Sequence, residues 1–352
     1  MKNVHILFLI SVLLLSFSAC RKETVEVDYI PTPYTLKIPS DFPAMAIPAD
    51  NPMTVEGVQL GRRLYYDDLL STNGRSCSSC HLQELGFSHP MAGPGGFGIM
   101  AHINIGWNTA FGWHGGESLL DHVPLADLAE GNAFLEANND SIRVRFARNA
   151  DYKTRFKQAF GVDIVALDVA QRQEYIAKAL GQFIRTQISG NSRFDQFMRS
   201  DPNSNFSAAE FRGYQLFFTE KGDCFHCHPY PMMTDGNLYN NGLDGSHNGI
   251  NIGQFNVTND SNDIGKFRVP TLRNIGLSAP YMHDNRFATL EEVVGYYNAG
   301  VQHSATLAPI MTKPGGHLDL QLTPDEVADL VAFLHSLTDT SFTNNPELRS
   351  PF

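Results

Sequence analysis

The chain has 352 residues, of which 42% are hydrophobic and 18% are charged, which is enough apolar sequence for about two folded domains. It contains 26 lysines and arginines and 37 aspartates and glutamates, which gives a formal net charge of −11. An acidic balance of this kind does not favour binding to nucleic acid. The 5 cysteines include two closely spaced pairs, and the single cysteine outside them leaves nothing for a structural disulfide.

The chain begins with the features of a secretory signal. An apolar run from Val4 to Phe17 follows Lys2, and it is too short to span a membrane as an ordinary helix. It ends on Phe17-Ser18-Ala19-Cys20, which resembles the box at which bacterial lipoproteins are cleaved and lipidated. We therefore expect a signal peptide over residues 1–19 and a lipid anchor on Cys20. The alternative is an ordinary cleavable signal with an incidental cysteine.

Residues 20–50 are predicted to form a lipidated tether and an N-terminal arm. Five prolines favour an extended chain in this stretch: Pro31, Pro33, Pro39, Pro43 and Pro48. The first helix is expected after them, where apolar residues at helical spacing run from Val58 to Leu69. With no other run long enough to span a membrane, the chain is predicted to be periplasmic and anchored by lipid to a membrane of the cell envelope.

The run Cys77-Ser78-Ser79-Cys80-His81 has the pattern of a c-type haem attachment site. Two thiols at this spacing form thioethers with the haem, and the histidine directly after them binds the iron. The pattern recurs as Cys224-Phe225-His226-Cys227-His228. A zinc site made of both pairs and two redox disulfides are alternatives, but neither explains a histidine after each pair. The sequence therefore predicts two covalent haems, with His81 and His228 as iron ligands.

A glycine-rich stretch from Phe87 to Gly116 follows the first haem motif. A long irregular loop directly after a haem motif more often has a function than serves only as a connection. A helix is then expected from a cap at Asp168 to Ile188, and Ser189-Gly190-Asn191 after it marks the domain boundary.

Capping boxes at Ser207, Thr289 and Thr323 predict three further helices in the second half of the chain. Strand-like alternation is scarce throughout. The predicted fold is all-α, with two cytochrome c-like haem domains and long irregular loops. The first haem domain is expected over residues 51–190 and the second over residues 191–352.

Several segments resemble the bacterial di-haem cytochrome c peroxidases and the related enzyme MauG. They cover nearly all of the chain after the tether, and they are Leu60–Asp67, both haem motifs, Phe267–Asn274, Ala279–Asp284 and Ala288–Glu292. The resemblance implies a di-haem c-type peroxidase that reduces hydrogen peroxide to water at the first haem. It further implies that a small electron donor, such as a cytochrome c, delivers electrons to the second haem.

Two other functions stay open at this point. One is a MauG-like di-haem oxidase that acts on a partner protein, and the other is a di-haem electron-transfer cytochrome without turnover of its own. The resemblance also leaves open a calcium ion between the domains, because Phe97-Gly98-Ile99-Met100 stands where the family has Arg-Asn-Ala/Ser-Pro.

Two catalytic residues are implied by the resemblance. Trp113 matches the tryptophan between the haems, where an indole can shorten the path of an electron; a packing role is the alternative. Glu130 matches the distal carboxylate by its spacing from Pro124. Such a carboxylate can move a proton from one peroxide oxygen to the other. The family has Met where this chain has Gly131, and a surface glutamate without a role is the alternative.

The resemblance also bears on the ligands at the far sides of the two irons. At the first haem the resemblance implies either His89 or an open position, and His89 is otherwise a solvated loop residue. At the second haem, counting from Ala288-Thr289-Leu290-Glu291 places Tyr297 where typical peroxidases have Met and MauG has Tyr. Helical spacing puts Tyr297 on the same side as Val293. A core tyrosine beside the haem, with Met311 as ligand, is the alternative.

Overall fold

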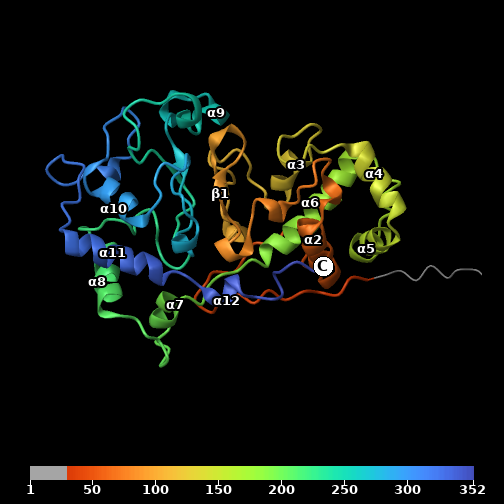
Figure 1. Ribbon diagram of the computed structural model, residues 1–352, viewed down its shortest axis with the longest axis horizontal. Coiled ribbons are helices and arrows are strands. Elements are labelled where there is room, and N and C mark those ends of the chain that lie inside the picture. Colours follow the sequence, from red (N-terminus) through yellow and green to blue (C-terminus); the bar gives the residue numbers. More distant parts are fainter. Residues whose placement is uncertain (1–29) are drawn as a thin grey trace, which may run out of the picture. The chain divides into compact units, whose positions relative to one another are not determined.

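The computed structural model describes residues 30–352 and is mostly helical (Figure 1). The predicted all-α class with two cytochrome c-like domains is confirmed. The predicted signal peptide and Cys20 lie outside the described residues. Among the helices that are described, none is long and apolar enough to cross a membrane.

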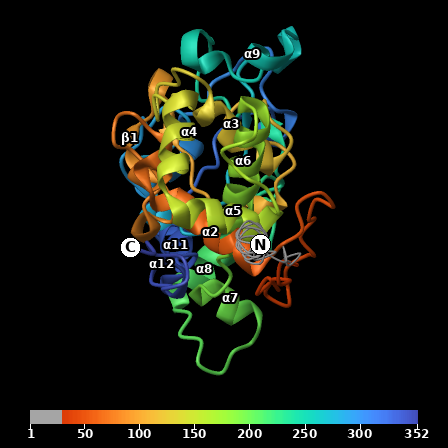
Figure 2. The same cartoon turned by 90° about the vertical axis from the view of Figure 1, so that its right-hand side faces the viewer.

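The helices of the first half are α2 (Val55–Tyr66), α3 (Val123–Leu128), α4 (Asn139–Arg148), α5 (Ala150–Phe160) and α6 (Val169–Arg185). In both views α2, α5 and α6 lie together (Figures 1 and 2). The predicted cap Asp168 begins α6 in a capping box with Gln171. At the crossing of α2 and α6, a Cβ atom on Gly61 would fall 1.9 Å from the Ala179 carbonyl oxygen. The crossing therefore requires glycine.

The helices of the second half are α7 (Arg193–Met198), α8 (Ala208–Phe217), α9 (Phe255–Thr258), α10 (Leu290–Ala299), α11 (Pro324–Ser336) and α12 (Thr340–Thr343). The predicted capping boxes at Ser207, Thr289 and Thr323 begin α8, α10 and α11. A Cβ atom on Gly213 of α8 would fall 1.9 Å from the Asp329 carbonyl oxygen of α11. Each haem motif thus follows a helix that crosses another helix through a glycine.

Two short antiparallel strand pairs stand in the loops that follow the haem motifs. They are β1 (His89–Ala92) with β2 (Gly98–Ile99), and β3 (Leu238–Tyr239) with β4 (Phe267–Arg268). The second strand of each pair lies at the start of a longer loop, and these two loops share several backbone features.

The loop from Phe97 to Glu117 is repeated by the loop from Phe267 to Phe287. Each contains a left-handed asparagine, Asn104 or Asn274, with φ of 56° and 57°, followed by one turn of 3-10 helix. Each closes on a single antiparallel bridge near its end. Gly98 donates its N–H to the His283 carbonyl at 2.8 Å, and the equivalent Arg268 donates to the Trp113 carbonyl at 2.9 Å. These reciprocal bonds join the two haem domains.

The connection between the halves is held by Asp339, which is only 2% exposed. Its Oδ2 atom accepts hydrogen bonds from the Ser189 hydroxyl and from the Gly190 and Asn191 amides, at 3.2, 3.1 and 2.9 Å. The predicted division at residue 190 falls in this connection. Because Asp339 also caps α12, it ties the connection to the last helix.

The C-terminal segment after α12 returns to the first half of the chain. Phe342 and Leu348 are buried in the hydrophobic core formed by the first-half helices. The Tyr66 hydroxyl of α2 donates to the Leu348 carbonyl at 2.7 Å, and the Gln83 side chain donates to the Asn345 carbonyl at 2.9 Å. The second half of the sequence thus contributes to the packing around the first haem motif.

Candidate haem centres

Both haem motifs form the same tight turn. The His81 amide donates to the Cys77 carbonyl at 3.1 Å, and the His228 amide donates to the Cys224 carbonyl at 3.0 Å. These bonds place the histidine beside the thiols that precede it. The sequence-predicted pairs and histidines are therefore brought together in both domains.

The imidazole rings are oriented in the same way. Nδ1 lies 2.9 Å from the Phe87 carbonyl oxygen in His81 and 3.0 Å from the Met233 carbonyl oxygen in His228. A carbonyl oxygen only accepts, so Nδ1 is the donor and Nε2 keeps a lone pair for iron. Burial lowers the pKa of both histidines to about 4, which favours the neutral ring that metal binding requires.

A cavity next to the second motif suits a haem. It is lined by Cys224, Cys227 and His228 and otherwise mainly by apolar side chains, among them Leu272 and Leu334. Two thiols for the thioethers, a free imidazole nitrogen for the iron and an apolar wall for the porphyrin are the donor set of a c-type centre. The residues present therefore fit the predicted cofactor.

The predicted ligand Tyr297 lines this cavity, and so does its rival Met311. The neighbouring Tyr296 turns away and donates to the Asn241 carbonyl at 2.8 Å. The Asn241 side chain donates a hydrogen bond to the Tyr297 hydroxyl oxygen at 3.0 Å. Burial raises the pKa of Tyr297 to about 12, while the bond from Asn241 acts in the opposite direction. Sequence analysis did not identify Asn241, because this residue lies far from Tyr297 and the rest of α10 in the sequence.

Trp113 stands at the junction of the two domains. Its indole N–H donates to the Gly98 carbonyl at 2.8 Å, and its own carbonyl accepts the Arg268 amide. The side chain is half-buried and lines the cavity of the second haem. Trp113 itself belongs to the loop after the first haem motif, so a residue of the first haem domain lines the cavity of the second haem.

His102 lies against the predicted ligand of the first haem. The rings of His102 and His81 are stacked with centroids 3.6 Å apart, and the Tyr65 hydroxyl lies 3.1 Å from Nδ1 of His102. Burial holds the pKa of His102 well below its usual value. In the repeated loop Leu272 takes the equivalent position. His102 is thus an unusual polar neighbour of the His81 ring.

The other two histidines of this loop have different surroundings. Nδ1 of His89 accepts the Met91 N–H at 3.0 Å, and the charge of His89 contributes to the lowered pKa of His81, after burial. His114 packs edge-on against Phe97 with centroids 4.9 Å apart, and its buried Nε2 has no hydrogen-bond partner among the described residues. Either His89 or an open position therefore stays the prediction for the far side of the first haem.

Glu130 is exposed and bound to the start of α4. It accepts hydrogen bonds from the Asn138 side chain at 2.7 Å and from the Asn139 amide and side chain at 3.0 and 2.8 Å. These bonds lower the pKa of Glu130, and the bond from the Asn139 amide has the largest effect. A carboxylate held in this way is ionised at neutral pH and has a clear structural role.

A second carboxyl group, Asp127, lies nearer the first haem motif. It is half-buried on α3, and burial raises its pKa to about 6. After burial, its charge is the largest contribution that raises the pKa of the Cys77 thiol, and it also acts on Cys80. Sequence analysis did not single out Asp127. The sequence contains one signal for Asp127. It lies four residues after Val123, which packs on the core, and residues four apart lie on the same side of a helix.

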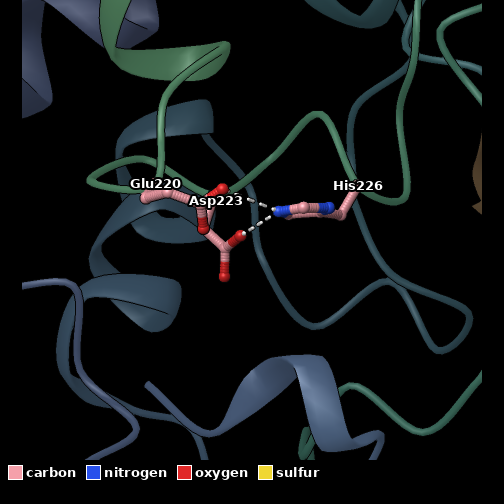
Figure 3. Close-up of side chains that lie close together, drawn as sticks. All are labelled: Glu220, Asp223 and His226. Atoms are coloured by element: carbon pink, nitrogen blue, oxygen red, sulfur yellow. Dashed lines mark ion pairs between the residues drawn. The ribbon is translucent and has the colours of Figure 1, made fainter. Parts of the chain in front are cut away.

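A polar cluster flanks the second haem motif (Figure 3). Nε2 of His226 lies 3.4 Å from a Glu220 oxygen and 3.2 Å from Oδ1 of Asp223. The other Asp223 oxygen pairs with Lys313, which also lines the haem cavity. Because Lys313 already compensates the Asp223 charge, we interpret the cluster as a set of ion pairs that hold the motif.

Comparison with known proteins supports the same assignment. Residues 55–203 match the family of di-haem cytochrome c peroxidases, and residues 211–338 match cytochrome c. The chain is 33% identical to "Cytochrome-c peroxidase IdrP1" of Denitromonas iodatirespirans, over 87% of this chain and 88% of the relative. It is 32% identical to "Methylamine utilization protein MauG" of Methylorubrum extorquens, over 82% of this chain and 80% of the relative.

A solved structure has the same fold over almost its whole length. It is described as a MauG-like protein associated with microbial copper homeostasis, and it superimposes with a TM-score of 0.81 at 33% identity. The match covers 90% of this chain and 99% of that one. With two c-type haem motifs in this shared fold and relatives of this identity, the chain belongs to the di-haem cytochrome c peroxidase and MauG family and carries two covalently bound haem c groups.

Proposed function

We propose that this protein reduces hydrogen peroxide to water at the first haem, with electrons that a small donor delivers through the second haem. The observation that carries the proposal is the position of Trp113, which comes from the loop after the first motif and lines the cavity of the second. When bound, haem iron supplies the electron transfer that splits the oxygen–oxygen bond. The chain supplies the iron ligands His81 and His228, the path between the haems and the protons.

Protons must reach a peroxide oxygen as the bond between the oxygens breaks. A carboxyl group with a pKa near the working pH can both release and take up a proton. Asp127, with its pKa raised to about 6, suits this role. Glu130, which the family resemblance indicates, is the second candidate, and its hydrogen bonds to Asn138 and Asn139 favour the ionised form.

Steady-state turnover with reduced cytochrome c as donor tests the proposal. Wild-type protein should oxidise the donor only when peroxide is present. Trp113→Phe should slow this reaction. Trp107→Phe is the matched control, because the Trp107 indole packs on Phe42 and donates to the Pro43 carbonyl, away from the haem cavity. If the wild type holds both haems and oxidises no donor, the proposed function is wrong.

A second candidate function is a MauG-like oxidase that takes electrons from a partner protein. Tyr297 in the second cavity favours it, because a phenolate ligand stabilises oxidised iron, whereas methionine raises the potential. Spectra recorded after peroxide is added without a donor separate the two functions. If peroxide changes the spectrum of the oxidised protein and the change lasts, the oxidase is supported. If the protein reacts with peroxide only after it has been reduced, the peroxidase is supported.

We further infer a lipid-anchored periplasmic location. The inference is supported by the run Phe17-Ser18-Ala19-Cys20 and by Cys20 being the one cysteine outside the haem motifs. The N-terminal arm from Pro31 onward would then connect the anchor to the first haem domain.

A further inference from the structure

Four arginines are buried in the described part of the chain, with exposed fractions of 2–5%: Arg172, Arg185, Arg268 and Arg273. A buried guanidinium cation is costly unless an anion or enough hydrogen bonds compensate it. Arg185 has Asp121 at 2.6 Å, and Arg273 has Asp195 at 2.8 Å. Two of the four are therefore neutralised by carboxylates.

Arg172 is compensated in another way. It donates to the carbonyls of Ile164 at 3.2 Å and Leu167, and the charges of Asp140 and Asp168 act on it. It too is therefore surrounded by acceptors and acidic groups.

Arg268 has no such partner among the described residues. Its Nε donates to the Gly112 carbonyl at 3.3 Å, and one terminal nitrogen lies 3.5 Å from the Met100 sulfur, which is a weak acceptor. The other terminal nitrogen, Nη1, makes no hydrogen bond to the described chain. Burial is the sole cause that lowers the pKa of Arg268, to about 10. The guanidinium is thus a buried cation without a counter-charge.

The position of Arg268 indicates what the counter-charge is. The side chain lines the cavity that also contains Cys224, Cys227 and His228. The other cation on this wall, Lys313, is already paired with Asp223. Arg268 is therefore the uncompensated cation of the second haem cavity within the described residues.

The backbone does not require an arginine at this position. Gly98 occupies the equivalent place in the first loop and makes the reciprocal hydrogen bond to His283. The first loop therefore makes this hydrogen bond without a cation. The backbone hydrogen bond therefore does not explain the arginine side chain, which lines the cavity of the second haem.

We infer that Arg268 binds a carboxylate of the haem held by Cys224 and Cys227 and places it beside Trp113. Haem carries propionate groups that are ionised at neutral pH, and arginine binds carboxylates in a bidentate geometry. The pair would leave neither charge uncompensated inside the protein. This inference rests on the second haem site of the proposed enzyme and is independent of peroxide turnover.

Redox titration of the holoprotein tests the inference. A cation next to a haem favours the reduced state, so Arg268→Gln should lower the midpoint potential of one haem and leave the other unchanged. We expect the reduction equilibrium of that haem to change by about tenfold or more, or about 59 mV for one electron. Arg268→Lys, which keeps the charge, should lie between the variant and the wild type.

Arg212→Gln is the matched control, because Arg212 is exposed and paired with Asp329 away from the cavity lining. It should leave both potentials unchanged. Equal potentials in wild type and Arg268→Gln would overturn the inference. The result does not depend on turnover, so an inactive enzyme with a shifted potential would refute the proposed function and keep this inference.

A dissolved anion is the rival source of negative charge. If chloride or phosphate compensates Arg268, the potential of the wild type will depend on the concentration of that anion, and this dependence will overturn the inference. Resonance Raman spectra of the wild type give a check if Arg268→Gln does not fold. A propionate bending band typical of a hydrogen-bonded carboxylate supports the inference, and its absence from both haems contradicts it.

Discussion

The two candidate carboxyl groups, Asp127 and Glu130, differ in pKa, the property that proton transfer depends on. Asp127 has a pKa raised to about 6 by burial, whereas the pKa of Glu130 is lowered by bonds to Asn139 and Asn138. A carboxyl that titrates near neutral pH exchanges protons readily, and one held ionised by several donors does not.

We therefore predict that Asp127→Asn slows peroxide turnover by about a hundredfold or more, the loss expected for a general acid or base. Glu130→Gln should have the smaller effect, together with a loss of stability from the start of α4. Steady-state rates of the two variants, each with both haems attached, decide between the carboxylates. A larger loss in Glu130→Gln would return the role to Glu130.

Tyr297 is the second residue whose chemistry can be tested directly. The bond from Asn241 favours a phenolate, whereas burial raises the pKa to about 12, so iron must displace the proton for ligation. If Tyr297 is the ligand, Tyr297→Phe should change the near-infrared spectrum of the oxidised second haem and raise its potential. Met311→Leu should change neither. A methionine-type band in the wild type that survives Tyr297→Phe would assign the ligand to Met311 instead.

At the scale of elements, each haem motif depends on a helix crossing that only glycine allows. A Cβ atom on Gly213 would lie 1.9 Å from a carbonyl oxygen of α11, and backbone cannot yield as a flexible side chain does. Gly213→Ala should therefore destabilise the protein by about 2–3 kcal/mol, although alanine favours a helix by about 1 kcal/mol.

Gly295→Ala provides the control for that substitution. Gly295 lies inside α10, and a Cβ atom there would meet nothing within 4 Å. This variant should be neutral or gain up to about 1 kcal/mol. Denaturant unfolding of the holoprotein, followed by far-UV circular dichroism, measures both effects. Equal stability of the two variants would show that the α8 and α11 crossing tolerates a side chain.

Sequence reasoning found the elements whose signals are local. The capping boxes at Ser207, Thr289 and Thr323 lie at the helix starts that the structure has, because a cap depends on residues three apart. The haem motifs are local in the same sense. Their thiols and histidines could be assigned from spacing alone.

What sequence reasoning missed depends on contacts between distant segments. In the two repeated loops, Gly112 with φ of 72° in the first is replaced by Met282 with φ of 72° in the second. A left-handed methionine gives no sequence signal. Asp127 was missed because α3 has only six residues, too few for a helical pattern to emerge.

At the scale of the whole molecule, the two haem domains are joined by polar contacts as well as by sequence. Asp339 holds the connection at Ser189, and the chain after α12 packs into the first core through Phe342 and Leu348. We expect the two halves to unfold together for this reason, since separating them would expose the apolar side chains of Phe342 and Leu348 to water.

The proposed lipid anchor can be tested at Cys20. Cys20→Ser should move the protein from the membrane fraction to the soluble fraction, because lipidation requires the thiol of that residue. Mass spectrometry of the mature N-terminus identifies the modification. An unlipidated terminus in the wild type would refute the anchor and leave an ordinary secreted protein.

In the proposed reaction the two haems of one chain act together on peroxide. Reduction of one peroxide to water needs two electrons, which the two reduced irons can supply as one electron each. The direct measurement is rapid mixing of the fully reduced protein with one equivalent of hydrogen peroxide, followed by absorbance. Both reduced haems should be oxidised in the same turnover. Loss of one reduced haem while the other persists would contradict it.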